Sequence, residues 1–478
     1  MSSLAPNKQL SRFELTALVV GSMIGSGIFA LPAAFGRTTG VYGALVAWAI
    51  AGGGMLCLAL VFQSLSRRKP ALDTGIYAYA RAGFGDYAGV LSALGYWIGC
   101  CLADVACLIL IKATLGQFFP ILGDGSTAAA IVSASLLLWG FHFLILRGIK
   151  QAALLNTIAT VAKLVPLAVF LFVVARGFQR DVFAWNGWGG DTPGTGTLWS
   201  QVRGTLLVTV FVFVGIEGAS VYSRFARDRR DVGFATVLGF LGVLCLLVLV
   251  TILSYGILLR PDLAALRNPS MAGVMEAVVG PWGRVFVSVG LLVSVLGNYL
   301  SWSLLAAEVL HSAALNDAMP RGLSRENAAG VPSAALWLTN GVIQAFLLVT
   351  WFAEYAFTLA LKMTSAMTLV PYLLVGAYQL KLALQGETFQ GDRAVVRTRA
   401  GVIAAIATAY ALLMLLAGGS RYLLLSALLY APGSVLFFLW QRERGAARLN
   451  RYEATACVVL CAAALWALWA LASGRLRL

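Results

Sequence analysis

Charged residues are scarce in this sequence. They make up 12% of its 478 residues, whereas roughly 25% of the residues of an average soluble protein are charged. Hydrophobic residues make up 60% of the chain, and its mean hydropathy is +0.84. These proportions exclude a soluble globular protein and predict an all-α polytopic membrane protein, because helices span a bilayer with their own backbone hydrogen bonds satisfied.

Histidine is rarer still, with two residues, His142 and His311. Each is interpreted as a packed helix residue. An integral-membrane enzyme would need a cluster of His, Asp or Cys near one interface, and the sequence contains none. The cysteines have no zinc-ligand spacing and indicate helix packing rather than a disulfide framework. We therefore expect a protein that is not an enzyme and has no metal or cofactor.

The sequence also lacks a long hydrophilic segment and a concentrated basic patch. No loop is long enough for a sensory or docking domain, which argues against a receptor or scaffold. The first apolar run continues past a poor cleavage region, so no cleavable signal peptide is expected. The net charge is +15, but the basic residues are dispersed between apolar runs, so nucleic acid is not an expected partner.

Runs of about 20 apolar residues, enough to span a bilayer as a helix, predict thirteen transmembrane helices. The predicted spans are 13–35, 41–64, 86–116, 127–146, 152–175, 201–223, 233–258, 283–313, 333–351, 355–380, 400–418, 421–440 and 454–473. A twelve-span arrangement, with the last helix lying elsewhere, remains open.

Basic residues are concentrated in alternate connections between the spans. With a cytoplasmic N-terminus, the inside segments hold most of these residues, including Arg67, Arg68 and Lys69. The positive-inside rule therefore predicts a multi-pass protein of the cell (inner, cytoplasmic) membrane with its N-terminus in the cytoplasm. Arg475 and Arg477 disagree mildly, since thirteen spans place them outside.

Two spans contain weak places. The segment 21–29 interrupts the first span with Gly21, Gly25 and Gly27, and each glycine inside a helix costs about 1 kcal/mol. The sixth span contains Gly215 and Gly218 around a carboxylate. Broken helices persist in a membrane where they line a cavity. If spans one and six begin two five-helix halves inserted in opposite directions, the breaks meet near the midplane.

Four ionisable residues within the predicted spans are functional candidates. Glu217 either satisfies freed N–H groups or titrates protons and gates the substrate. Asp104 either pairs with a basic neighbour such as Lys112 or binds a cationic substrate. Lys163 either packs or bonds unwound carbonyls where a sodium ion would otherwise lie. Lys362 either lines the site, pairs with an acid or reaches a water-filled edge.

The aromatic residues include one further candidate. Trp302 follows a polar break in the eighth span, at Gly297–Ser301. The face of an indole is the best aromatic partner for a cation. Packing in the core is the alternative interpretation for this residue.

Short motifs in the chain resemble the basic amino acid/polyamine antiporter family of the amino acid–polyamine–organocation (APC) superfamily. These motifs are Gly21–Phe29 with Leu31-Pro32, Gly75–Arg81 with Phe84-Gly85, Gly95–Trp97, Gly215–Glu217, Leu304–Ala306 and Leu369–Tyr372. A closer similarity to the arginine/ornithine antiporters is carried by Arg68–Asp73, Arg81–Tyr87, Asn268–Ala272, Val279–Gly283 and Tyr378–Leu384.

The resemblance implies a LeuT-type (APC) fold with two inverted five-helix repeats plus two or three C-terminal helices. It divides the chain into a cytoplasmic segment 1–12, a first repeat 13–175, a second repeat 201–380 and additional helices 400–473. Small-molecule amino acids and the lipid bilayer are the implied partners, and a homodimer is left open.

The resemblance also implies which residues bind the substrate. In the family, the substrate's α-carboxylate and amine are held at the positions that match Ile24, Gly25, Ser26 and Gly27. Its α-amine is also held at the positions that match Val214 and Gly215. The head of the substrate's side chain is surrounded by the family positions that match Gly99, Cys100, Asp104 and Trp302. Gating or coupling positions match Tyr96, Lys163 and Glu217.

Three positions depart from the family pattern. Phe211 stands where a tryptophan commonly stacks on the substrate, and Asp104 stands where an asparagine contacts its head. Lys362 aligns with a serine of the site, which places a cation where a cation is to be bound. Lys362 either neutralises Asp104 or points away.

These features predict an amino acid antiporter that exchanges arginine for ornithine, or a related cationic amino acid or amine, by alternating access. The alternative is a proton-coupled amino acid uniporter or symporter of the same fold, because a titratable lysine at position 163 could couple protons.

Overall fold

The computed structural model describes residues 12–72, 76–148, 152–189, 196–217, 229–316, 318–353, 355–444 and 450–476. Within these ranges the secondary structure is helical and contains no strand. The long helices are α3 (Val41–Arg68), α5 (Asp86–Gly116), α6 (Ala128–Leu146), α7 (Ala152–Gly177), α11 (Arg229–Ser254), α14 (Pro281–Leu315), α15 (Ser333–Val349), α16 (Ala356–Gln385), α17 (Ala394–Ala417), α18 (Gly419–Arg444) and α19 (Arg451–Ala472).

Ten helices of the described ranges are long and apolar enough to cross a membrane, or eleven if a bent pair near the N-terminus counts as one span. These helices coincide with eleven of the predicted spans. The fifth predicted span coincides with α7. The sixth coincides with α9 (Leu198–Phe211) and the residues that follow it. An all-α membrane protein is therefore confirmed, and the count of thirteen spans remains a prediction.

The first predicted break is present as a bend. Helix α1 (Arg12–Met23) ends at the glycine-rich segment, and a short 3-10 helix, η1 (Ser26–Ala30), continues into α2 (Leu31–Gly36). The direction of the helix bends by 46° between the two arms. Gly25 before η1 is extended, with φ −117° and ψ −158°. The helix therefore opens at Ile24 and Gly25, where the sequence has its weakest helix former.

The second predicted break lies at the end of α9. The chain leaves the helix after Phe211 and turns through residues 212–217. Gly215 has φ +107°, a left-handed conformation that glycine adopts without the steric cost of a side chain. Gly218 lies outside the described residues.

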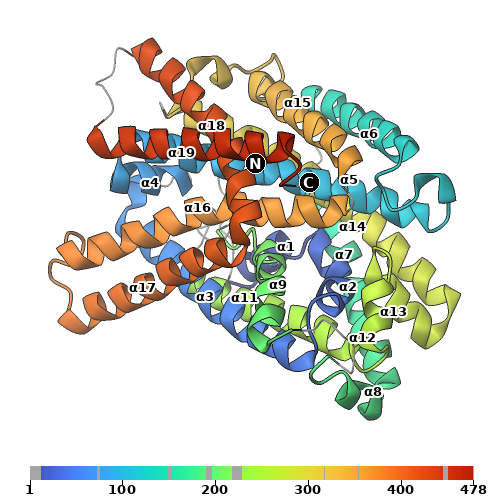
Figure 1. Cartoon of the computed structure of the whole chain (residues 1–478). Helices are drawn as coiled ribbons and strands as arrows, with labels where there is room; N and C mark the ends of the chain where they lie inside the picture. The colour runs from blue at the N-terminus through green and yellow to red at the C-terminus, as the bar shows by residue number, and fades with distance from the viewer. Residues whose placement is uncertain are drawn as a thin grey trace.

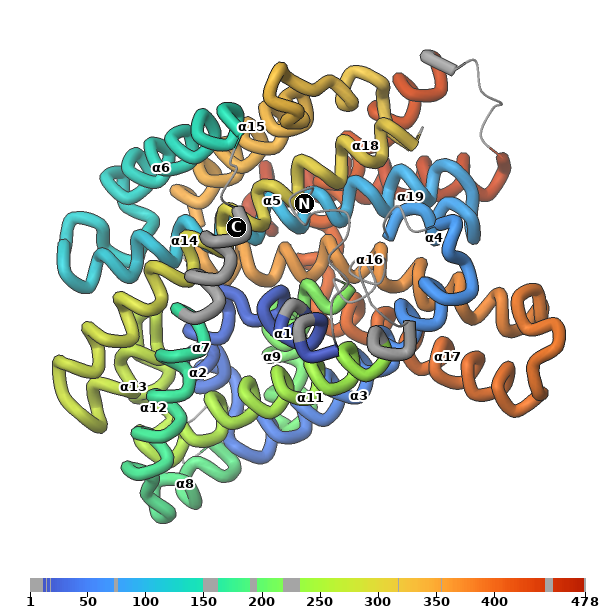
Figure 2. The backbone as a smooth tube through the Cα atoms, turned by 180° about the vertical axis from the view of Figure 1, so that it is seen from behind, coloured from blue at the N-terminus to red at the C-terminus, as the bar shows by residue number. Residues whose placement is uncertain are grey.

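The long helices surround these breaks in a symmetric pattern of neighbours. Helix α1 packs on α11 while α9 packs on α3, and α5 packs on α16 while α7 packs on α14. In both views the broken helices lie in the middle of the molecule, and α6 and α15 lie side by side at one edge (Figures 1 and 2). Each pairing joins a helix of one predicted half to a helix of the other, and the second pairing of each pair is the first with the two halves exchanged. The division into repeats remains a prediction.

Smaller helices lie on one side of the molecule, at the right and lower right of Figure 1. They are α8 (Arg180–Trp185), α12 (Arg260–Ala265) and α13 (Ser270–Val279). Helix α4 (Ile76–Phe84) packs on α5, and α19 packs on α18. The long helices enclose a core that holds the two breaks, so the site is built from buried helix interruptions.

Candidate functional site

The two breaks touch each other. A Cβ added to Gly27 would lie 2.7 Å from Phe211 Cδ1 and 2.7 Å from Val212 Cγ1, so glycine permits the close approach. The Ser22 hydroxyl donates a hydrogen bond to the Gly215 carbonyl at 3.1 Å. A side chain at position 215 would meet the Ser22 carbonyl oxygen at 2.6 Å. Both glycine-rich segments are therefore shaped by contact with the other.

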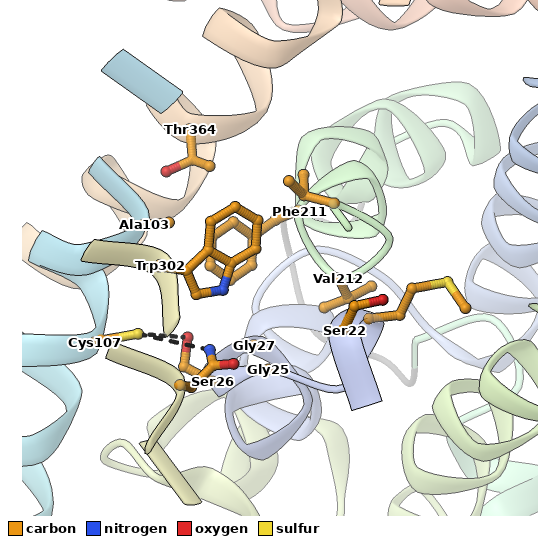
Figure 3. Close-up of a pocket in the computed structure, with 13 residues that line it drawn as sticks. Ser22, Gly25, Ser26, Gly27, Ala103, Cys107, Phe211, Val212, Trp302 and Thr364 are labelled. Carbon is orange, nitrogen blue, oxygen red and sulfur yellow. Dashed lines mark hydrogen bonds between the residues drawn. The ribbon is translucent and has the colours of Figure 1, made fainter. Parts of the chain in front are cut away.

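A small cavity lies beside this contact. Figure 3 shows its walls, with Trp302 and Phe211 presenting their rings between Thr364 and the first break. Its lining residues are Ser22, Met23, Gly25, Ser26, Gly27, Ala103, Cys107, Phe211, Val212, Val214, Asn298, Trp302 and Thr364. None of these described residues carries a charge. A polar backbone at one wall and two aromatic rings at another therefore shape the cavity.

The thiol of Cys107 joins two other walls of the cavity. Its Sγ lies 3.7 Å from Ser26 Oγ and accepts a long hydrogen bond from Asn298 Nδ2 at 3.9 Å. These interactions are the dashed lines in Figure 3. They place side chains of α5 and α14 beside η1, so the first break is held against the frame helices.

The cavity closes along the interface between α5 and α16. Ala103 and Thr364 line it from these two helices. One turn further, a Cβ at Gly99 would lie 2.6 Å from Thr368 Cγ2, which leaves no room between the helices. Gly99 was predicted to surround the substrate head. The structure places it in this tight contact, beyond the lining residues.

A buried carboxylate lies on the far side of that contact. The hydroxyls of Tyr96 on α5 and Tyr372 on α16 both donate to Glu217, the latter at 2.6 Å. The Gly215 amide donates to the same carboxylate at 3.2 Å. Tyr96 lies two helical turns, roughly 10 Å, from Ala103 on the cavity wall. This cluster joins α5, α16 and the second break.

Lys163 of α7 is the third residue predicted to gate or couple transport, besides Tyr96 and Glu217. Its side chain is 3% exposed, and its amine donates a hydrogen bond to the Gly21 carbonyl at 2.9 Å. Gly21 lies in the last turn of α1, where carbonyls lack partners within the helix. The side chain therefore satisfies a carbonyl that the break leaves free.

The predicted site residues divide into two groups. Gly25, Ser26, Gly27, Phe211, Val214 and Trp302 line the cavity. Ile24, Gly99, Cys100, Asp104, Gly215 and Lys362 do not belong to its lining. Their roles toward a substrate remain predictions.

Two of the charged candidates point elsewhere. Asp104 is fully buried and its Oδ2 accepts a hydrogen bond from the Ser303 hydroxyl at 2.8 Å. The amine of Lys362 lies 5.7 Å from the ring centre of Tyr422 on α18. The ion pairs of the described residues do not include a pair between Asp104 and either Lys112 or Lys362.

Several lining residues were not predicted from the sequence: Ser22, Met23, Ala103, Cys107, Val212, Asn298 and Thr364. A signal was present for some of them. Ala103 and Cys107 are one turn apart on α5, as are Asn298 and Trp302 on α14, so each pair shares a helix face. Tyr372 was also missed, although it ends the motif Leu369–Tyr372.

Comparison with known proteins agrees with this architecture. The chain matches the family model described as amino acid permease over residues 10–418. It is 52% identical to the arginine/ornithine antiporter of Pseudomonas aeruginosa, covering 99% of each chain. It is 40% identical to the L-lysine transport protein of Corynebacterium glutamicum, covering 99% of this chain and 97% of the relative. It is 36% identical to the arginine/agmatine antiporter of Chlamydia pneumoniae, covering 99% of each.

Proposed function

Because the chain belongs to the amino acid permease family, we propose that it is an antiporter that exchanges arginine for ornithine across the cytoplasmic membrane. The observation that carries this proposal is the uncharged cavity where the two helix breaks meet. Relatives named for arginine, ornithine and lysine point to a basic amino acid as substrate. The names of the same relatives support a transporter rather than an enzyme.

The cavity has separate parts for the two ends of such a substrate. The backbone at Gly25, Ser26 and Gly27 opens the second arm of a broken helix, where N–H groups without helical partners bind a carboxylate. The rings of Phe211 and Trp302 supply faces for a cationic side chain. A cation on an aromatic face gains about 0.5–2 kcal/mol, more when desolvated. We assign the α-carboxylate to the first wall and the guanidinium or ammonium to the second.

Alternating access uses the Glu217 cluster as a gate. With the N-terminus in the cytoplasm, the helix order places Tyr96, Glu217 and Tyr372 on the cytoplasmic side of the cavity. Their hydrogen bonds join α5 and α16 to the second break. Opening toward the cytoplasm requires these bonds to separate, so the carboxylate holds the closed state.

Lysine is the second candidate substrate, because a relative that covers nearly the same length is named for it. The aromatic faces accept an ammonium as well as a guanidinium. Proton-coupled uniport or symport on the same fold is less favoured, because two of the three relatives described above are named antiporters. A role of Lys163 in coupling protons to transport nevertheless remains part of the proposal.

The test is exchange by the purified full-length protein in proteoliposomes. Vesicles are loaded with ornithine, agmatine, cadaverine, lysine, histidine or a neutral amino acid, and uptake of labelled arginine is followed. We expect rapid uptake into ornithine-loaded vesicles and little uptake into empty ones. Arginine uptake under none of these loads would refute the assignment. Equal uptake into empty vesicles would instead favour uniport.

A pair of variants connects this activity to the cavity. Trp302→Ala removes one aromatic face, whereas Trp282→Ala removes an exposed tryptophan near the other end of α14, away from the cavity lining. We expect Trp302→Ala to raise the KM for arginine roughly tenfold and Trp282→Ala to leave it unchanged. Equal effects would show that the cavity is not the binding site.

A further inference from the structure

The hydrogen bond between Asp104 and Ser303 joins two helices directly behind the cavity wall. Asp104 follows Ala103 on α5, and Ser303 follows Trp302 on α14, so each partner is next to a lining residue. Both polar side chains are fully buried. The bond therefore lies where a shift of α14 would move the Trp302 indole relative to α5.

A second polar contact repeats this arrangement one turn away. Asn298 of α14 donates to the Cys107 thiol of α5 at 3.9 Å, and both residues line the cavity. The two helices pack closely along their length. From the first contact to the second, the residue number rises on α5, from 104 to 107, and falls on α14, from 303 to 298. This is the order expected of antiparallel helices. Together they set the register of α14 against α5.

The carboxylate itself does not face the cavity. Its Oδ2 is occupied by Ser303, and its Oδ1 is buried without a hydrogen-bond partner among the described residues. The lining residues that the structure describes carry no charge. A substrate in the cavity therefore meets the neighbours of Asp104, namely Ala103 and Cys107, before it meets the carboxylate.

We propose that Asp104 is a positioning residue, which holds Trp302 in the cavity wall through its hydrogen bond with Ser303, and that its charge does not bind the substrate head. This inference rests on the proposed function for its kinetic consequence. It assigns substrate preference to the aromatic wall and gives Ser303 the same role as Asp104. An asparagine at position 104 keeps an acceptor for the Ser303 hydroxyl, so it should preserve the role that alanine abolishes.

The test compares arginine exchange by Asp104→Ala, Asp104→Asn and Ser303→Ala in proteoliposomes. Ser301→Ala is the matched control, because that serine is exposed and bonds its own helix at Gly297. We expect alanine at 104 or 303 to raise the KM for arginine about tenfold, with a smaller effect on the maximal rate. Asp104→Asn and the control should stay within about threefold of wild type.

A second comparison separates positioning from a general loss of structure. In a Trp302→Ala background, Ser303→Ala should add no further rise in KM, because the residue through which it acts is gone. Additive effects would overturn the proposal. It would also be overturned if Asp104→Asn were as harmful as Asp104→Ala and weakened lysine and arginine more than neutral amino acids, since the charge would then be the ligand.

The register of α14 against α5 can also be tested without a transport assay. The rate at which N-ethylmaleimide modifies the buried Cys107 should depend on how tightly α5 and α14 pack. Tandem mass spectrometry of peptides distinguishes that cysteine from the others. We expect faster modification in Asp104→Ala and Ser303→Ala than in Asp104→Asn and Ser301→Ala. Wild-type protein that exchanges no arginine would refute the proposed function alone. Equal modification rates in all four variants would refute the positioning role.

Discussion

The amine of Lys163 donates a hydrogen bond to the carbonyl of Gly21, across 142 positions of sequence, at 2.9 Å. The bond joins the middle of α7 to the last turn of α1, immediately before the first break. A buried carbonyl without a partner costs about 1–3 kcal/mol. The lysine therefore stabilises the very segment that opens the cavity, and it does so from a helix that does not line it.

Replacing Lys163 by alanine should impair exchange by about ten- to a hundredfold while the protein still folds, because one carbonyl at the break loses its donor. Lys112→Ala is the matched control, a buried lysine on α5 outside the cavity lining. Arginine exchange is measured between pH 5 and 9. A variant whose rates follow the wild-type pH profile would show that Lys163 does not couple protons.

Gly27→Ala should abolish substrate binding and lower stability. The added methyl group would meet Phe211 and Val212 at 2.7 Å, and overpacking of this kind typically costs about 1–3 kcal/mol. Gly53→Ala on α3 is the control, because no atom lies within 4 Å of its added methyl group. The control should raise the melting temperature slightly. Normal arginine binding by Gly27→Ala would contradict the close contact of the two breaks.

Tyr372→Phe should weaken closure on one side of the cavity. The change removes a donor to the Glu217 carboxylate and leaves the ring in place. Loss of a hydrogen bond to a charged group costs about 1.5–3 kcal/mol, so an engineered cysteine beyond the gate should become accessible to a water-soluble thiol reagent. Tyr430→Phe is the control: it removes a hydrogen bond from α18 to the Met367 carbonyl on α16, the helix that also carries Tyr372. It should not change the accessibility of the engineered cysteine.

Arg68 should stabilise the end of α3 through more than its charge. Its guanidinium pairs with Asp392 at 2.9 Å, donates to the Thr388 carbonyl at 2.7 Å and lies 3.7 Å from the ring centre of Phe389. We expect Arg68→Ala to lower the unfolding free energy by about 1–3 kcal/mol. Asp392→Asn should cost below about 1 kcal/mol, because that pair is partly exposed.

Thermal melting in low and high salt checks this comparison. Salt should reduce the small effect of Asp392→Asn further, since it screens an exposed pair. The effect of Arg68→Ala should persist, because the carbonyl bond and the ring contact are less screened. Equal losses in the two variants at low salt would show that the ion pair is the main contribution.

Glu453 should anchor α19 as well as cap it. Its carboxylate accepts from the Asn450 amide at 3.1 Å in a capping box and from the Tyr87 amide at the start of α5 at 3.3 Å. Glu453→Ala should therefore cost about 1–2 kcal/mol. Asn450→Ala, which affects the cap alone, should cost about 1 kcal/mol. Hydrogen exchange at the start of α5 should increase in the first variant and not in the second.

The helices and their breaks could be predicted because both depend on local sequence. A run of apolar residues as long as a bilayer is thick has few alternatives to a helix. Glycines at positions 25 and 215 lower the cost of leaving that helix, so the breaks at Ile24–Gly25 and after Phe211 lie where they were expected. The positions of the cavity walls at Gly25–Gly27 and Trp302 followed from the same segments and from the family resemblance.

The direction of individual side chains could not be predicted in this way. Successive residues of a helix point about 100° apart, so Ala103 faces the cavity while Asp104 faces Ser303. On α16, Thr364 lines the cavity whereas Lys362, half a turn away, lies against Tyr422. The helix that packs on each face selects between such neighbours.

The sequence by itself determined a helical membrane protein with two weak points, because hydrophobic length and glycine content act within one segment. The tertiary structure decided which groups serve those weak points. Lys163 reaches Gly21, and Tyr96 and Tyr372 reach Glu217, across more than 100 positions of sequence in each case. Such contacts depend on how distant helices pack, and no local pattern encodes that packing.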